Sequence, residues 1–244
     1  MEITYIGHSG FLMEWENCYW LFDYYTGSIP VLDPGKKLFV FSSHKHADHF
    51  NPEIFSLKDQ YPNIEYILSS DIRLPKEYRE TAAASTRDRI RSVEPRGEYL
   101  LQDAQGHRIV LKTLRSTDCG VAFLLSYRET TVYHAGDLNH WIWKGEVKQV
   151  NNNMTAMFEK EMKELQELSI DIAFVPLDPR QEEWYYLGIQ KLLDTARVRY
   201  VFPMHFWDKP EIVQQFRQER GSYMNGAQLM DVKEAGQRWR LEDL

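Results

Sequence analysis

Residues 43–49 read Ser-His-Lys-His-Ala-Asp-His, which places three of the chain's eight histidines and one carboxylate within six positions. The apolar segment Leu38–Ser42 before them predicts a buried strand. If the chain is still extended beyond this strand, His44 and His46 lie two residues apart and project to the same side. Their imidazoles could then share one cation.

Asp48 and His49 follow at the point where the chain must turn. Residues 51–53, Asn-Pro-Glu, supply a good cap and first turn for a helix after that turn. Asp48 and His49 could therefore face a second cation beside the first. Imidazole with carboxylate is the ligand set expected for zinc, manganese or iron. A solvated polar loop is the alternative, but so dense a cluster of a rare residue favours metal binding.

The spacing His-x-His-x-Asp-His at the end of a strand resembles the hallmark of the metallo-β-lactamase superfamily, and further segments match in order. Residues 3–14 resemble the two-strand start of the branch that includes ascorbate-6-phosphate lactonase-like proteins. Residues 20–23 resemble the strand that ends in the first-motif Asp, here Asp23. Residues 132–137 resemble the strand and Gly-Asp that deliver a metal-bridging carboxylate, and residues 201–205 resemble the late strand that ends in the last ligand.

This resemblance implies an α/β fold, an αββα sandwich of two mixed β-sheets flanked by helices, with residues 1–244 as one domain. It implies one or two divalent metal ions, with zinc expected first and manganese or iron as alternatives. Asp23 would support the metal loop without binding the metal. The implied ligands of one metal are Asp48, His49 and His205, those of the other are His44 and His46, and Asp137 bridges the two.

The resemblance fails at the third motif, which normally supplies a histidine to the site begun by His44 and His46. Residues 112–123 contain no histidine. Asp118 is one substitute, since a carboxylate binds zinc and suits harder metals, but it could equally be a turn residue that bonds its own backbone. His107 fits an exposed turn better. We therefore expect this site to bind its cation more weakly, and occupancy by a single metal stays open.

The expected chemistry is attack by a metal-bound hydroxide, because a divalent cation lowers the pKa of bound water and polarises the electrophile. The expected function is a metal-dependent hydrolase of an ester, lactone or phosphodiester bond of a small substrate, for which an anionic group stays open. A metal-binding sensor or scaffold of the same fold, without turnover, is the alternative that the missing histidine favours.

The candidate catalytic residues are Asp48, His8 and His140. His8 follows the first expected strand, where it could bond the substrate or protonate a leaving group, or could be a capped turn residue. His140 lies on the loop after Asp137 and is a second candidate acid.

Three further residues are candidates for binding the substrate. Arg180 could hold a phosphate or carboxylate with two hydrogen bonds, or could form a structural pair with Asp178. Trp141 and Trp207 flank the expected site. Aromatic residues line ligand pockets, but they also fill cores and dimer interfaces, so a homo-oligomer stays open.

Composition sets limits on the partners and the location of the protein. The 244 residues carry a formal net charge of −7, which argues against a nucleic-acid-binding surface. The first residues lack a basic start followed by an apolar core, and no apolar run has the length of a membrane span. Two cysteines cannot build a disulfide framework. These features predict a cytoplasmic protein with a small-molecule substrate.

Short apolar or alternating segments predict strands, and amphipathic spacing predicts helices. The expected strands are Glu2–Tyr5, Gly10–Trp15, Tyr19–Asp23, Leu38–Ser42, Tyr66–Ser69, Ile109–Leu114, Val121–Ser126, Thr131–His134, Ile172–Val175 and Tyr200–Phe202. The expected helices are Pro52–Gln60, Ala156–Leu168, Leu187–Ala196 and one that starts from a capping box at Asp208–Glu211. Propensity alone indicates only a mixed α/β protein.

Overall fold

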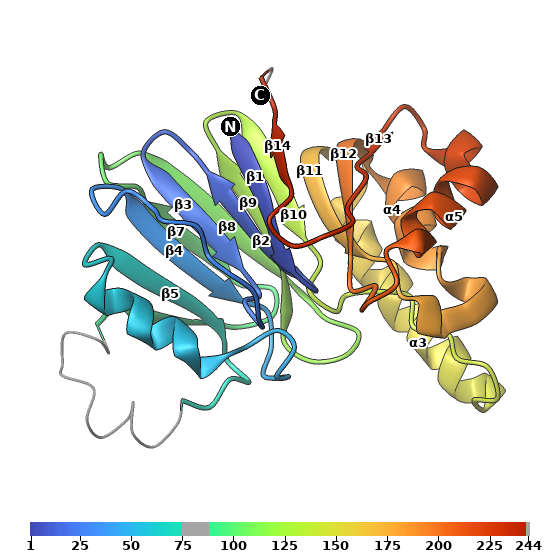
Figure 1. Cartoon of the computed structure of the whole chain (residues 1–244). Coiled ribbons are helices and arrows are strands. Elements are labelled where there is room, and N and C mark those ends of the chain that lie inside the picture. Colours follow the sequence, from blue (N-terminus) through green and yellow to red (C-terminus); the bar gives the residue numbers. More distant parts are fainter. Residues whose placement is uncertain (75–87, 243–244) are drawn as a thin grey trace.

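Two seven-stranded sheets pack face to face in the computed structural model, which describes residues 1–74 and 88–242 (Figure 1). The first sheet holds most of the N-terminal half of the chain. Tight turns join β1 to β2 and β2 to β3, a longer loop over residues 23–36 joins β3 to β4, and β3, β4, β5 and β6 are parallel. The order is β14 (Arg238–Arg240), β1 (Glu2–Gly7), β2 (Gly10–Glu14), β3 (Cys18–Phe22), β4 (Lys37–Ser42), β5 (Ile64–Ser69) and β6 (Ile90–Val93).

The second sheet is also mixed. Strands β7 to β10 are antiparallel, whereas β10, β11, β12 and β13 run parallel. The order is β13 (Gln228–Leu229), β12 (Arg197–Met204), β11 (Ser169–Pro176), β10 (Thr130–His134), β9 (Val121–Tyr127), β8 (Arg108–Arg115) and β7 (Glu98–Gln102).

Helices cover the outer faces of the two sheets. In Figure 1, α3 (Lys148–Met162), α4 (Leu187–Thr195) and α5 (Glu211–Arg220) lie beside β11 and β12. The 3₁₀ helix η1 (Pro52–Asp59) packs Ile54 and Phe55 against the first sheet. Three shorter 3₁₀ helices are η2 (Lys163–Leu165), η3 (Pro179–Trp184) and η4 (Gly221–Tyr223). This αββα sandwich is the expected fold.

Alternation along the strands explains why the sandwich forms. In β3, Trp20 and Phe22 join the core between the sheets, while Tyr19 and Leu21 join the outer cluster around η1. Both faces of such a strand are buried, so nearly every position is apolar. None of the described helices is both long and apolar enough to cross a membrane.

Ten described strands contain the ten expected segments, although Trp15 and Asp23 lie one residue past the ends of β2 and β3. The strands β6, β7, β13 and β14 were not predicted. Each is a short strand at or next to a sheet edge, and β14 reads Arg-Trp-Arg, so none has the apolar pattern of a buried strand.

Three expectations for the helices were wrong in detail. The segment after Asn51 is a 3₁₀ helix rather than an α-helix. Helix α3 begins at Lys148 and not at Ala156, because its first turns are polar and exposed and carry no apolar stripe. Helix α5 has Pro210 at its cap position and no side-chain cap bond, so Asp208 does not form the expected capping box.

The carboxyl ends of several strands from both sheets lie at one edge of the sandwich. Asp23 follows β3 and His44 follows β4 of the first sheet, and Asp137 follows β10 and His205 follows β12 of the second. Because the inner faces of the sheets pack closely, loops at these strand ends must meet across the sandwich.

The rigidity of this frame depends on aromatic packing between the sheets. Phe41 is fully buried, stacks on Phe22 with a centroid distance of 4.8 Å, and meets Phe123 of the opposite sheet at 5.4 Å. We expect Phe41→Ala to lower the free energy of unfolding by about 3–5 kcal/mol, since it removes the ring and leaves a cavity.

Denaturant unfolding measures this loss, and Val31→Ala is the control because Val31 is 98% exposed. The control should change stability by less than about 0.5 kcal/mol. A loss below about 1 kcal/mol in Phe41→Ala would show that the sheets repack without this ring.

Candidate metal centre

The loop after β4 carries four of the candidate ligands. It ends at Asn51, whose side chain accepts a hydrogen bond of 2.9 Å from the Glu53 amide at the start of η1. The amides of His49 and Phe50 both donate to the carbonyl of His46, which closes a turn. His44 and His46 therefore converge from a bend, not from the extended chain that the sequence suggested.

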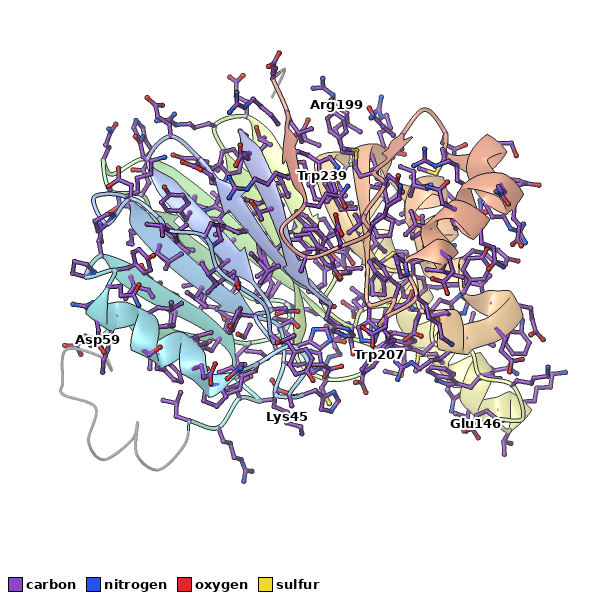
Figure 2. All side chains as sticks on the ribbon, viewed as in Figure 1. Lys45, Asp59, Glu146, Arg199, Trp207 and Trp239 are labelled. Atoms are coloured by element: carbon purple, nitrogen blue, oxygen red, sulfur yellow. The ribbon has the colours of Figure 1, made fainter. Side chains whose placement is uncertain are left out.

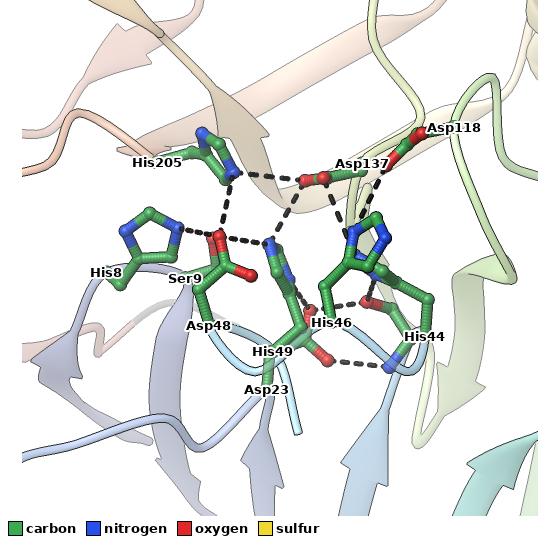
Figure 3. Close-up of polar contacts among 12 residues, drawn as sticks. His8, Ser9, Asp23, His44, His46, Asp48, His49, Asp118, Asp137 and His205 are labelled. Atoms are coloured by element: carbon green, nitrogen blue, oxygen red, sulfur yellow. Dashed lines mark hydrogen bonds and ion pairs between the residues drawn. The ribbon is translucent and has the colours of Figure 1, made fainter. Parts of the chain in front are cut away.

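One group of possible ligands combines side chains from three separate loops: His8, Asp48, His49 and His205. The Nε2 atom of His8 lies 3.4 Å from Oδ2 of Asp48, and the Nε2 atoms of His49 and His205 each lie 3.9 Å from the same oxygen. Figure 3 shows these rings turned toward one another around the Asp48 carboxylate.

The other group contains His44, His46, Asp118 and Asp137. His44 Nε2 lies 3.0 Å from His46 Nδ1, and that Nδ1 atom lies 3.3 Å from an oxygen of Asp118. Asp118, for which ligand and turn residue were both open, lies within reach of His46 and also lies in a turn, where its amide donates to the Ser116 hydroxyl. His107 instead contacts Asp103 at a turn, with a side chain that is 46% exposed.

Asp137 presents one carboxylate oxygen to each group. Its Oδ1 atom lies 3.2 Å from His49 Nε2 and 3.3 Å from His205 Nε2. Its Oδ2 atom lies 3.6 Å from His44 Nε2. The side chain is thus oriented to bridge two cations.

Two glycines allow the loops to approach this closely. Gly120 and Gly136 both have positive φ, and a Cβ atom on Gly120 would lie 2.0 Å from the carbonyl oxygen of Ser43. A Cβ atom on Gly136 would lie 2.6 Å from Cβ of Ser43. Both loops therefore pack against the start of the His44 loop, which brings Asp118 and Asp137 to it.

Buried atoms without partners test whether this centre fits a metal. The Nε2 atoms of His8, His49 and His205 and the Oδ1 atom of Asp137 are buried and make no hydrogen bond. Leaving a buried polar group unsatisfied costs about 1–3 kcal/mol. A cation held by these residues would give the unsatisfied atoms a partner, and imidazole with carboxylate is a common donor set for divalent transition metals. The residues fit.

Carboxylates behind the ligands fix the orientation of two rings. Asp23 lies 2.7 Å from Nδ1 of His49 and also accepts hydrogen bonds from the amide and hydroxyl of Ser43. Asp178 lies 3.0 Å from Nδ1 of His205. Such carboxylate–histidine pairs set which ring nitrogen faces the metal. The role of Asp23 was expected, whereas Asp178 was considered only as a partner for Arg180.

Burial and neighbouring charges shift the pKa values of two histidines in opposite directions. Burial lowers the pKa of His44 to about 4, so this ring is neutral at neutral pH. Burial also opposes the charged form of His49, but the carboxylates of Asp137 and Asp23 on either side raise its pKa well above the ordinary value of 6.5. In the metal-free protein, His49 therefore carries a proton that a metal would have to displace.

The expected catalytic residue His140 does not join either group. Its Nε2 atom lies 2.8 Å from the hydroxyl of Thr155, and its ring stacks on Phe158 at 5.2 Å. These contacts give His140 a structural place beside α3, which does not fit the expected role of an acid.

The expected substrate-binding residues lie around the centre. Trp141 donates a hydrogen bond of 3.0 Å to the carbonyl of Asp137, and the guanidinium of Arg180 lies 4.7 Å from the ring of Trp207. Arg180 also forms the structural pair with Asp178 that was its alternative role. Figure 2 shows Trp207 and Lys45 at the lower side of the molecule, where the metal loops lie. A cavity of about 200 Å³ is lined by Thr117, Asp118, Asp137, Trp141, Trp143, Met154 and Arg180.

Solved structures share this fold. The metallo hydrolase Igni18 of the archaeon Ignicoccus hospitalis matches with a TM-score of 0.65 and 19% identity over 99% of both chains. CmlA, a diiron β-hydroxylase of Streptomyces venezuelae, matches with a TM-score of 0.64 and 12% identity over 98% of this chain and 54% of its own.

Sequence comparison identifies the family. A metal-dependent hydrolase of Opitutus terrae is 27% identical over 229 residues, or 87% of either chain. The family described as the Beta-lactamase superfamily domain matches residues 2–205, which include all the candidate ligands of both groups. The chain therefore belongs to the β-lactamase superfamily of metallo-β-lactamase-fold proteins.

Proposed function

We propose that this chain is a metal-dependent hydrolase that cleaves an ester, lactone or phosphodiester bond of a small anionic molecule. The observation that carries this proposal is the pair of ligand groups on either side of Asp137, whose buried nitrogen and oxygen atoms include four that make no hydrogen bond. The similarity to a metal-dependent hydrolase of Opitutus terrae supports the same class.

The chain's own residues would divide between two cations. Asp48, His49 and His205 would hold one, with Oδ1 of Asp137, while His44, His46 and Asp118 would hold the other, with Oδ2 of Asp137. When bound, a divalent cation lowers the pKa of water toward neutrality and polarises the bond to be cleaved. Zinc suits these ligands, and manganese and iron accept them as well.

Arg180 favours an anionic substrate. Its guanidinium donates to Asp178 through Nε and Nη2, yet the side chain is 48% exposed and lines the cavity beside Asp118 and Asp137. Arginine has five N–H donors in a fixed fork, so donors remain for a carboxylate or phosphate. Two dications would exceed the charge of the ligand carboxylates, which adds to the attraction for an anion.

Two tryptophans line the cavity next to Arg180. Trp141 and Trp143 stack in parallel at 5.7 Å and line the cavity together with Met154. The ring of Trp207 also packs against the guanidinium of Arg180, at 4.7 Å. A cavity of about 200 Å³ with one arginine and an apolar wall suits a small molecule better than a polymer.

The alternative of a sensor or scaffold rested on the missing third-motif histidine. Asp118 belongs to the same possible ligand group as His44 and His46, with an oxygen 3.3 Å from His46, which supports it as the substitute. The arrangement of the described residues therefore favours catalysis over a disabled site.

Metal binding is the first test. We expect purified protein to hold between about one and two equivalents of zinc, bound most tightly at Asp48, His49, Asp137 and His205. Elemental analysis measures the content. A His49→Ala, His205→Ala double variant should lose the tight equivalent, and content below about a tenth of an equivalent in reconstituted wild type would overturn the assignment.

The raised pKa of His49 adds a pH dependence to metal binding. Because His49 is protonated in the metal-free protein at neutral pH, binding should release about one proton and the affinity should rise with pH. Without metal, the stabilisation from protonated His49 is fully present below its unfolded pKa and is lost as pH rises through its folded value. Calorimetric titration in two buffers of different ionisation enthalpy counts the protons, and no release would contradict this assignment.

Asp118 should control the second equivalent. We expect Asp118→Ala to weaken the second metal by about tenfold or more and to leave the first nearly unchanged, because the carboxylate belongs to only one group. Titration with a competing chelator separates the two affinities. Asp59→Ala, at an exposed position, is the control. Unchanged binding would make Asp118 a turn residue, and equal loss of both metals would indicate a folding defect.

Turnover should need the metal. In a screen of phosphodiesters, lactones and simple esters with an anionic group, we expect at least one class to be hydrolysed, with activity lost on chelation and restored by zinc or manganese. The rate should rise with pH through a single ionisation near neutrality. Activity that resists chelation would refute the mechanism. If no substrate class is hydrolysed although the metal is fully bound, the sensor or scaffold would be favoured.

A further inference from the structure

His8 lies on the turn between β1 and β2 and belongs to the ligand group of Asp48, His49 and His205. We infer that His8 is itself a ligand of the tightly held cation, through Nε2, and not an acid that acts on the substrate. This inference rests on the metal dependence proposed above. It gives that cation three imidazoles and one oxygen from each of Asp48 and Asp137.

The ring of His8 is buried and aimed at the centre. Its side chain is 5% exposed, and its Nε2 atom, which makes no hydrogen bond, lies 3.4 Å from Oδ2 of Asp48. The ring centroid lies 4.3 Å from that of His205 and 5.5 Å from that of His49. Figure 3 shows the three imidazoles on different sides of Asp48, as expected for ligands of one ion.

The separations match a single coordination shell. Two ligand atoms that are each about 2.1 Å from one cation lie roughly 3.0–3.9 Å apart when their angle at the metal is near 90–140°. The distances from Asp48 Oδ2 to the three Nε2 atoms are 3.4, 3.9 and 3.9 Å. His8 therefore stands at the same range from this oxygen as the two histidines that the family resemblance implies as ligands.

The backbone fixes His8 directly to another ligand. His8 has a positive φ of 53°, which is uncommon for a residue other than glycine, although histidine adopts it more often than most residues. Its carbonyl oxygen accepts hydrogen bonds from the amide of His205, at 3.2 Å, and from the hydroxyl of Tyr5, at 3.3 Å. The strained turn thus holds an imidazole from the first sheet at a fixed distance from one of the second sheet, and strain of this kind is concentrated at functional positions.

The cavity beside the centre argues against an acid role. Its lining includes Asp118, Asp137 and Arg180 but not His8. The ring of His8 meets Trp207 edge-on at 4.7 Å and Tyr25 at 6.2 Å. Covered by these rings and directed at Asp48, His8 faces a cation rather than the leaving group of a substrate in this cavity.

An asymmetry between the two cations follows. Five protein atoms would surround the cation held by His8, and four would surround the other, where the side chains of His46 and Asp118 are 44% and 42% exposed. The less enclosed cation, next to the cavity, would exchange first and would be the one that the substrate reaches. A chelator should therefore remove the metals in two steps, with the His8 cation last.

The test uses wild type labelled with ¹⁵N-histidine and loaded with one equivalent of ¹¹³Cd. We expect one-bond couplings from cadmium to the Nε2 atoms of three histidines, and the His8→Asn variant should lose one of them. Asparagine suits the left-handed backbone of this position but is too short to place an atom where Nε2 lies. Couplings to only two imidazoles in wild type would overturn the inference.

A second measurement compares metal affinity in matched variants. His8→Asn should weaken the tightly held zinc by at least about tenfold, whereas His140→Asn, which removes an imidazole outside both groups, should change the affinity less than about twofold. Equal affinities of His8→Asn and wild type would also overturn the inference. If wild type binds no cadmium or zinc at all, the proposed metal dependence fails; if it binds metal through two imidazoles, only the role of His8 fails.

Discussion

The buried carboxylate of Asp137 is the interaction on which the rest of the centre depends. A buried charge is stable only when it is paired, and Asp137 lies within 3.6 Å of the imidazoles of His44, His49 and His205. Burial would raise its pKa, but these rings hold the pKa of Asp137 far below the ordinary range. Its main chain is fixed as well, because Trp141 and Thr117 donate to its carbonyl oxygen. A cation on each side would complete the pairing that imidazoles alone leave partial.

The packing between the sheets makes this meeting of side chains possible. His134, at the end of β10, stacks on Phe22 of the opposite sheet at 4.8 Å and lies 3.0 Å from the carbonyl of Ser9. The same core contains Phe41 of β4, the strand before the metal loop, and Phe174 of β11, the strand before the loop of Asp178. The ligand loops are short and begin at strands that cannot shift without opening this core, so the frame limits the positions of the ligands.

Each sheet also provides a carboxylate behind a ligand. Asp23 of the first sheet orients His49, and Asp178 of the second orients His205. Asp178 passes this constraint on to Arg180, whose guanidinium stacks against Trp207. The orientation of the His205 ring and the position of the proposed anion-binding group therefore depend on one buried carboxylate.

The sequence by itself determined the residues that are local in the chain or that follow an apolar strand. The cluster from His44 to His49, the Gly-Asp at Asp137 and His205 at a strand end all reach the centre, because a buried strand fixes where its carboxyl end lies. The αββα sandwich was likewise evident, from alternating apolar segments together with the family resemblance. The edge strands β6, β7, β13 and β14 were not, since their pairing depends on a neighbour and not on a pattern of their own.

Only the tertiary structure decided the contacts between distant loops. The position of Asp118 beside His46 depends on the close approach of the loop at Gly120, which the sequence does not reveal. From the sequence, His140 and His8 were comparable candidates for a catalytic acid. In the structure, the His140 ring stacks on Phe158, whereas the His8 ring faces Asp48. The direction of a side chain at the end of a loop depends on which parts of the chain pack against it, and those parts are more than a hundred residues away for His8 and His205.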